Sequence, residues 1–106
     1  MLVTADEVPD PQNLGLRLWV NGQLRQDGNT KNMIFPVHYV LWYLSQFMVL
    51  EPGDVVNTGT PAGVAMGLPG QPYLKPGDVL ELEIDGLGRQ RQTVGKARAE
   101  QLCPTR

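Results

Sequence analysis

The stretch Glu51-Pro52-Gly53-Asp54-Val55-Val56-Asn57-Thr58-Gly59-Thr60-Pro61-Ala62-Gly63 joins a turn, an apolar run and a glycine-containing loop. The Pro-Gly pair is a turn signal, and the valines after it predict a strand over residues 54–58. Residues 75–80 repeat the turn as Lys-Pro-Gly-Asp-Val-Leu, and residues 78–84 then alternate apolar and acidic side chains. Two strands that each follow a Pro-Gly turn favour a fold that is rich in β-structure.

The loop at residues 57–63 is the segment whose chemistry best suits a ligand. A strand that ends in such a loop presents backbone N–H groups and threonine hydroxyls at the edge of a sheet. These groups can hold a carboxylate or keto oxygen without a charged side chain. A structural connector, in which Gly59 and Gly63 permit tight backbone geometry, is the alternative that local chemistry alone favours.

The segment before this loop predicts a hairpin and a helix. Apolar residues alternate along 14–20, and Asn21-Gly22 is the signal of a type I′ turn into a second strand. Residues 33–50 carry no formal charge, and Pro36 suits an early helix position. Their apolar side chains recur at helical spacing, at Val37, Val40, Leu41, Leu44 and Met48. We therefore expect a buried amphipathic helix that packs on a sheet and stops at the Pro-Gly turn.

The end of the chain predicts one further strand and then a loose tail. A turn over residues 85–88 leads into a strand over residues 89–94, and we expect residues 97–106 to be loose. No βαβ unit is indicated. The fold class predicted from the pattern is α+β, mostly β, with one main amphipathic helix.

Composition restricts the kind of protein. At 106 residues and 42% hydrophobic, the chain can form one small domain. Nine basic and eleven acidic residues give a net charge of −2 without a block of like charge, which argues against nucleic-acid and membrane partners. The single cysteine, Cys103, cannot form an internal disulfide, and the first residues do not resemble a signal peptide. We expect a cytoplasmic protein.

Few side chains suggest catalysis on their own. His38 is the only histidine, and its place at the start of the predicted helix favours a structural role. Ser45, the only serine, lies late on the same helix and not on a nucleophile elbow. Glu81 and Glu83 share the polar face of a strand, where solvated surface is a better interpretation than a metal site. Another acidic group could contact a cation or cap turns: Asp6, Glu7 and Asp10.

Several segments together resemble the fumarylacetoacetate hydrolase family. They occur in the family's order and cover residues 3–92: 4–14, 20–26, 28–30, 33–35, 43–45, 50–55, 58–64, 74–78 and 83–88. Residues 87–92 resemble the branch that acts on 2,4-diketo-3-deoxy sugar acids and is often labelled ureidoglycolate lyase.

The resemblance implies a mixed β-roll that assembles as a homodimer and acts on small 2-oxo acids. It implies a Mg²⁺ or Mn²⁺ ion and cleavage of a C–C bond in 2,4-diketo, acylpyruvate-like acids, in sugar-acid or aromatic catabolism. An isomerase or decarboxylase of dienoate dicarboxylic acids is one alternative within the family, and a non-catalytic remnant is another.

The resemblance also implies that this chain carries only part of the site. The family's metal ligands, lysine and catalytic histidine–glutamate pair lie upstream of the matched region. We therefore expect residues 1–96 to be the C-terminal part of a catalytic domain that is inactive alone. Glu81 and Glu83 do not correspond to the metal-binding Glu-x-Glu. Thr60 is the functional position that transfers, as a ligand of the substrate carboxylate or 2-oxo group, with Gly59 shaping the loop.

Overall fold

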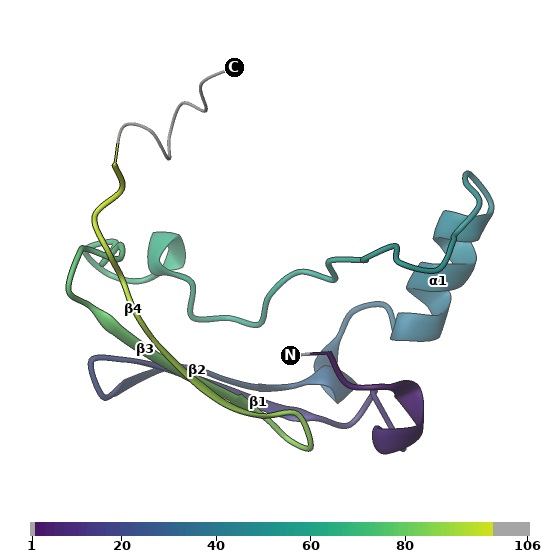
Figure 1. Ribbon diagram of the computed structural model, residues 1–106, viewed down its shortest axis with the longest axis horizontal. Helices are drawn as coiled ribbons and strands as arrows, with labels where there is room; N and C mark the ends of the chain where they lie inside the picture. Colours follow the sequence, from purple (N-terminus) through teal and green to yellow (C-terminus); the bar gives the residue numbers. More distant parts are fainter. Residues whose placement is uncertain (1, 99–106) are drawn as a thin grey trace.

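The computed structural model describes residues 2–98 and is organised around a four-stranded antiparallel sheet (Figure 1). The strands are β1 (Gly15–Val20), β2 (Gln23–Asn29), β3 (Val79–Ile84) and β4 (Gly88–Thr93), in the order β2-β1-β3-β4. Two hairpins, each local in sequence, are therefore joined by the pairing of β1 with β3. The mostly-β class with one main helix is confirmed.

The predicted hairpin at residues 14–24 is present as β1 and β2. Asn21 and Gly22 both have positive φ, 51° and 78°, as a type I′ turn requires. The turn also holds the start of β3. The Asn21 backbone N–H donates to the Val79 carbonyl, and the Val79 N–H donates to Asn21 Oδ1, both at 2.8 Å. Asn21 thus links the two hairpins at the end of the sheet where β1 finishes and β3 begins.

The second hairpin confirms the strands predicted at residues 78–84 and 89–94. Glu81 and Glu83 share a face, as expected, and arginines from the neighbouring strands bind both. Arg17 Nε lies 2.6 Å from Glu83 Oε1, and Arg89 pairs with Glu81 while its guanidinium lies 4.8 Å from the centre of the Trp19 ring. This face of the sheet is therefore a ladder of cross-strand ion pairs.

The carboxyl group of Asp85 connects this ladder to the start of β1. Arg17 Nη2 donates to Asp85 Oδ1 at 2.8 Å, and the Gly15 N–H donates to Asp85 Oδ2 at 3.0 Å. The Arg17 hydrogen bond first, and the Gly15 N–H second, hold the pKa of Asp85 below its ordinary value. The carboxylate therefore stabilises the outer end of the β1–β3 pair while it is ionised.

The predicted helix exists, but it is shorter and more exposed than expected. It is α1 (Val37–Ser45), and Pro36 is its N-cap with ψ of 160°, not an early helical residue. The helix ends at Ser45, well before the Pro-Gly turn. Just beyond that end, the Phe47 N–H donates to the Leu44 carbonyl. The prediction of a buried helix packed on a sheet is wrong, because α1 stands to one side of the sheet and buries none of its residues (Figure 1).

An aromatic row runs along and beyond this helix. Successive rings have centroids 5.1–6.4 Å apart, in the order Phe35, Tyr39, Tyr43 and Phe47. Half or more of Phe35, Tyr43 and Phe47 is exposed. This row shares no residue with the apolar stripe predicted from the sequence, and its rings pack on one another and not on the sheet. Across residues 2–98, no helix is both long and apolar enough to cross a bilayer.

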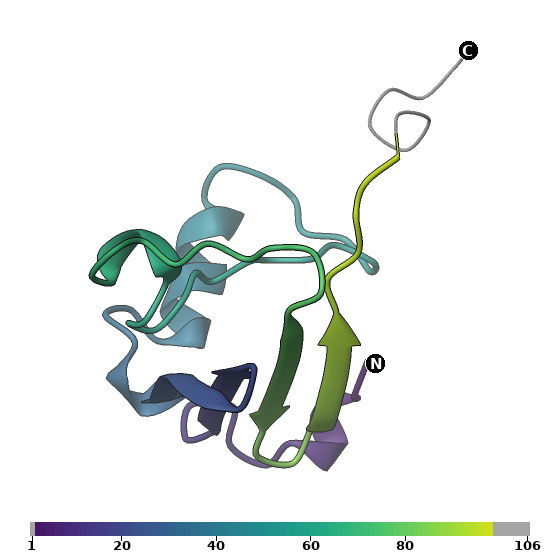
Figure 2. The ribbon, with the colours of Figure 1, turned by 90° about the vertical axis from the view of Figure 1, so that its left-hand side faces the viewer.

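The strand predicted at residues 54–58 is wrong. The turn before it forms, with the Asp54 N–H donating to the Glu51 carbonyl at 3.0 Å. Beyond the turn no strand is assigned, and Val55 is 88% exposed. Both views show the connection from α1 to the short 3₁₀ helix η3 (Ala65–Gly67) crossing one side of the sheet as extended chain, without joining it edge to edge (Figures 1 and 2). A strand needs a partner for its backbone, and this segment has none.

The predicted boundary between a domain at residues 1–96 and a tail at residues 97–106 is not tested. Residues 99–106, with Cys103 among them, lie outside the described residues.

Candidate functional site

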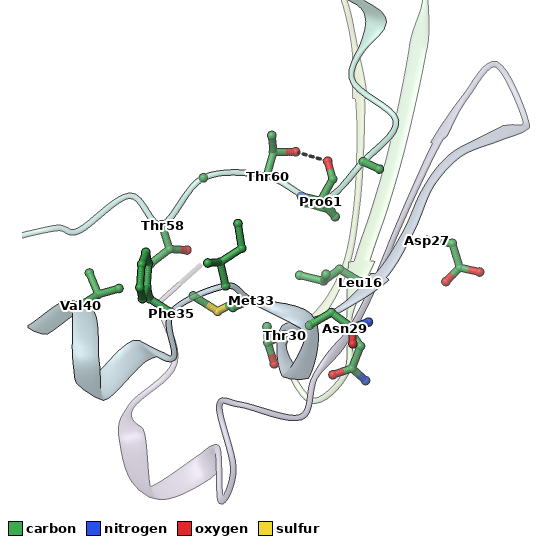
Figure 3. A pocket seen from close by; sticks show the side chains of 14 residues that line it. Leu16, Asp27, Asn29, Thr30, Met33, Phe35, Val40, Thr58, Thr60 and Pro61 are labelled. Carbon is green, nitrogen blue, oxygen red and sulfur yellow. Dashed lines mark hydrogen bonds between the residues drawn. The ribbon is translucent and has the colours of Figure 1, made fainter. Parts of the chain in front are cut away.

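A pocket of about 650 Å³ lies where the loop at residues 58–62 faces the sheet (Figure 3). Leu16 of β1 and Asn29 of β2 contribute its floor, and Met33 and Phe35 contribute apolar surface on the approach to α1. Thr30, in the short 3₁₀ helix η2 (Thr30–Asn32), also lines the wall, while its hydroxyl accepts the Leu14 N–H at 2.9 Å and donates to the Pro11 carbonyl at 2.8 Å. The pocket is thus apolar at one side and rich in neutral hydrogen-bonding groups at the other.

The loop is seated on β2 through a contact that only glycine permits. Gly63 has φ of 109°, and a Cβ built there would lie 2.0 Å from the Arg25 carbonyl oxygen. Pro61 also lies close to the strand, since a Cβ on Gly28 would be 3.0 Å from Pro61 Cβ. These two approaches fix the height of the loop above the sheet and therefore the width of the pocket.

The hydroxyl group of Thr60 is held at both its donor and its acceptor side. Thr60 Oγ1 accepts a hydrogen bond from Gln26 Nε2 at 2.8 Å and donates to the Pro61 carbonyl at 2.9 Å, the bond drawn in Figure 3. The Gly59 N–H donates to Asn57 Oδ1 at 3.1 Å. The backbone of this loop is therefore ordered by its own side chains and by one side chain from β2.

Thr60 and Gly59 both line the pocket, so the loop singled out in the sequence lies at the wall of a cavity. Their role in substrate binding remains a prediction. Among the described residues that line the pocket there is no lysine or arginine, and Asp27 is the acidic one. An anion would therefore meet neutral donors here, with any positive charge supplied from elsewhere.

Three residues weighed in the sequence are not among those that line this pocket. His38 is exposed on α1, and Ser45 Oγ donates to the Trp42 carbonyl within the same helix. Asp10 caps a turn, because its carboxylate accepts the Gln12 N–H at 3.0 Å. Sequence reasoning missed Gln26, although it lies in a segment that resembles the family. Only the approach of residues 60–63 to β2 shows that this glutamine belongs to the site.

The donor groups present do not make a metal centre. Over residues 2–98, no three or more His, Cys, Asp or Glu side chains are grouped so as to hold an ion. Glu81 and Glu83 point into the arginine ladder instead. That the metal ligands lie in another part of the enzyme remains a prediction.

Comparison with known proteins identifies the family. The model of the fumarylacetoacetate (FAA) hydrolase C-terminal domain matches residues 1–95. The chain belongs to the fumarylacetoacetate hydrolase family. It is 54% identical over 98 residues to a protein of Burkholderia multivorans that carries a provisional hydrolase name, and the match covers 92% of this chain and 35% of that protein.

Solved structures of the same family share the fold. Fumarylacetoacetate hydrolase from psychrophilic Exiguobacterium antarcticum is 43% identical with a TM-score of 0.84, over 90% of this chain and 34% of that one. Maleylpyruvate hydrolase from Sphingobium sp. SYK-6, in complex with manganese(II) ion and pyruvate, is 35% identical with a TM-score of 0.80. The match covers 92% of this chain and 34% of that one.

An isomerase has the same architecture. The 2-hydroxyhepta-2,4-diene-1,7-dioate isomerase from Mycobacterium marinum is 37% identical with a TM-score of 0.70, over 81% of this chain and 31% of that one. The family members that this chain resembles thus include both hydrolases and isomerases. The chain spans about a third of the length of the relatives it matches.

Proposed function

We propose that this chain forms the carboxylate-binding wall of an enzyme that hydrolyses a C–C bond in 2,4-diketo, acylpyruvate-like acids. The observation that carries the proposal is the position of Thr60 and Gly59 at the wall of a pocket that has polar and apolar sides. A 2-oxo carboxylate would meet the neutral donors of the loop, while the rest of the acid would lie against Met33 and Phe35.

Neutral donors suit this task. A hydrogen bond from a hydroxyl or backbone N–H to a charged carboxylate contributes about 1.5–3 kcal/mol, and it gives direction to the bound group. The pyruvate named in the Sphingobium complex is a 2-oxo acid of the kind expected here, and the hydrolase names of the relatives support the reaction class.

The proposed enzyme is larger than this chain and uses a divalent cation. The manganese(II) ion named for the Sphingobium structure supports such a cation in the family. Because the described residues do not fit a metal ion, its ligands belong to a part of the enzyme other than residues 2–98. A cytoplasmic homodimer that acts on small 2-oxo acids, with no nucleic-acid or membrane partner, completes the proposal.

Thr60→Val in the full-length enzyme tests the proposal. Valine keeps the shape of threonine and removes its hydroxyl, so we expect KM for an acylpyruvate to rise at least tenfold, while the affinity for the metal stays nearly unchanged. Thr93→Val is a matched control, because Thr93 is exposed on β4 and far along the sheet from the pocket. Steady-state kinetics and a metal titration give the two readouts.

An unchanged KM in Thr60→Val would remove this residue from the site. The reaction class has its own test, because hydrolysis of an acylpyruvate releases pyruvate whereas isomerisation of a dienoate dicarboxylic acid releases no fragment. Assays of both substrates on the full-length protein separate these outcomes. Turnover of the dienoate alone would overturn the hydrolase proposal.

A further inference from the structure

Gln26 reaches from β2 to two different atoms of the pocket loop. Its side-chain nitrogen, Nε2, lies 2.8 Å from Thr60 Oγ1 and 3.1 Å from the Pro61 carbonyl oxygen. The two acceptors lie 2.9 Å from each other, so the amide nitrogen faces both of them and can donate to either. Gln26 does not itself line the pocket, which means that any effect on a ligand must pass through the loop.

The Pro61 carbonyl accepts from a second donor. Thr60 Oγ1 donates to it at 2.9 Å, so the oxygen receives one hydrogen bond from Thr60 and one from Gln26. A carbonyl oxygen has two lone pairs, and both are occupied. The single proton of the Thr60 hydroxyl is therefore directed at the carbonyl of the next residue and not at the pocket.

This arrangement determines how Thr60 can serve a ligand. For its hydroxyl to donate to a carboxylate, the proton must turn away from the Pro61 carbonyl. That turn would break the hydrogen bond between the hydroxyl and the carbonyl, a net loss unless another donor takes its place. Gln26 supplies the other donor, so Pro61 stays hydrogen-bonded while the Thr60 proton moves to the ligand.

Resting on the proposed function, we infer that Gln26 is a positioning residue that makes the Thr60 hydroxyl available to the substrate carboxylate. Its second hydrogen bond acts on the same group, because donation to Thr60 Oγ1 fixes the side-chain rotamer. A hydroxyl that accepts a hydrogen bond is also a stronger donor, since hydrogen bonds in a chain polarise one another. Gln26 thus orients the Thr60 hydroxyl and donates to the Pro61 carbonyl when the hydroxyl proton turns to the ligand.

The contacts that hold the loop on β2 argue against the alternative that Gln26 serves only to anchor the loop. Gly63 against the Arg25 carbonyl and Pro61 against Gly28 hold the loop on β2 without the Gln26 amide group, although Gln26 Cγ also lies close to Gly63. Removal of the amide is therefore expected to leave the loop in place and to change the hydrogen bonding of Thr60. A residue that merely anchored the loop would affect every property of the pocket alike.

The test measures pyruvate binding to the full-length protein by isothermal titration calorimetry. We expect Gln26→Leu to raise the Kd for pyruvate about fivefold, the size of one lost neutral hydrogen bond. In the Thr60→Val background the same substitution should change Kd by less than about twofold, because the hydroxyl through which Gln26 acts is gone. Gln23→Leu on the exposed end of β2 is the matched control and should leave Kd unchanged.

A second variant keeps the shape of the side chain and adds a pH readout. Gln26→Glu has no donor when ionised and one donor when protonated. The ratio of its Kd to that of the wild type should therefore fall as the pH decreases through about 4.3. This recovery would show that the donor of the side chain, and not its bulk, is what affects binding, while the comparison with the Thr60→Val background separates positioning from anchoring. Circular dichroism of each variant confirms that it is folded before binding is compared.

The outcomes separate the inference from the proposed function. If Thr60→Val raises Kd but Gln26→Leu does not, or if Gln26→Leu has an equal effect with and without the Thr60 hydroxyl, the role of Gln26 is overturned and the proposed function stands. If Thr60→Val leaves pyruvate binding unchanged, the proposed function fails and the inference fails with it.

Discussion

The two Pro-Gly-Asp-Val turns have almost the same sequence and different outcomes. In each, the aspartate N–H donates to the carbonyl three residues earlier, at 3.0 Å for Asp54 and 3.1 Å for Asp78. In each, the aspartate side chain accepts the N–H of that earlier residue, at 2.8 Å in the first turn and 2.9 Å in the second. The second turn opens into β3, whereas the first opens into an exposed connection.

The difference lies in what surrounds the valine after each turn. The Val79 N–H donates to the Asn21 side chain of the first hairpin, and Val79 also pairs with Thr93 of β4. Its backbone groups therefore have hydrogen-bond partners on two sides. Val55 has no neighbouring strand and is 88% exposed. Local sequence thus sets the turn, and distant residues decide whether a strand follows it.

The largest expected effect tests the point where the first connection touches the sheet. Gly63→Ala places a methyl group against the Arg25 carbonyl at a φ that favours glycine. We expect it to lower the free energy of unfolding by about 3 kcal/mol, from backbone strain and overpacking together. Gly67→Ala is the control, because no atom lies near its added methyl group. Denaturant titrations that give equal stability for the two variants would show that the loop is not seated on β2.

A matched pair of substitutions compares the two valines directly. We expect Val79→Ala to lower the free energy of unfolding by about 1 kcal/mol, because it weakens a paired, half-buried strand position. Val55→Ala should change it by less than about 0.5 kcal/mol, because the side chain is exposed. The same denaturant titration measures both. Equal losses would mean that Val55 is paired or buried after all.

The smallest expected effect is on stability at low pH, and it depends on Asp78 in the second Pro-Gly turn. The hydrogen bond from the Asn21 side chain first, and the Lys75 N–H second, hold the pKa of Asp78 below its ordinary value. A lowered pKa in the folded state stabilises the fold above the unfolded-state value, and this stabilisation is lost as the pH falls through the folded-state value. We expect Asp78→Asn to flatten the decline of melting temperature as the pH falls below about 4. A variant profile parallel to that of the wild type would contradict this account.

Much of the sheet could be predicted because its signals are local. Asn21-Gly22 dictates a turn of one type, and the alternation along residues 78–84 marks a strand with a polar face. The partners of that face could not be predicted, because Arg17 meets Glu83 only after β1 pairs with β3. The apolar spacing from Val37 to Met48 misled the prediction of a buried helix for a related reason. Spacing identifies an apolar stripe, but it does not say which surface covers it.

The loop of the candidate site could be predicted from the sequence, but the side chain of β2 that binds the loop could not. Thr60 stands out by the composition of its own segment, and by resemblance to the family. Gln26 reads as an ordinary polar residue of a hairpin, and its importance depends on a loop more than thirty residues away, as the bond to Thr60 shows. Hydrogen bonds between segments so far apart leave no periodic trace in one sequence.

The strand order also has a consequence for how the chain reaches its fold. Each hairpin closes a short loop and can form in microseconds, but the contact that joins them, Leu18 opposite Leu82, encloses the whole intervening connection. Closing a long loop is entropically unfavourable before any distant contact forms. We therefore expect the docking of the two hairpins to be a slow step in the folding of this part of the enzyme.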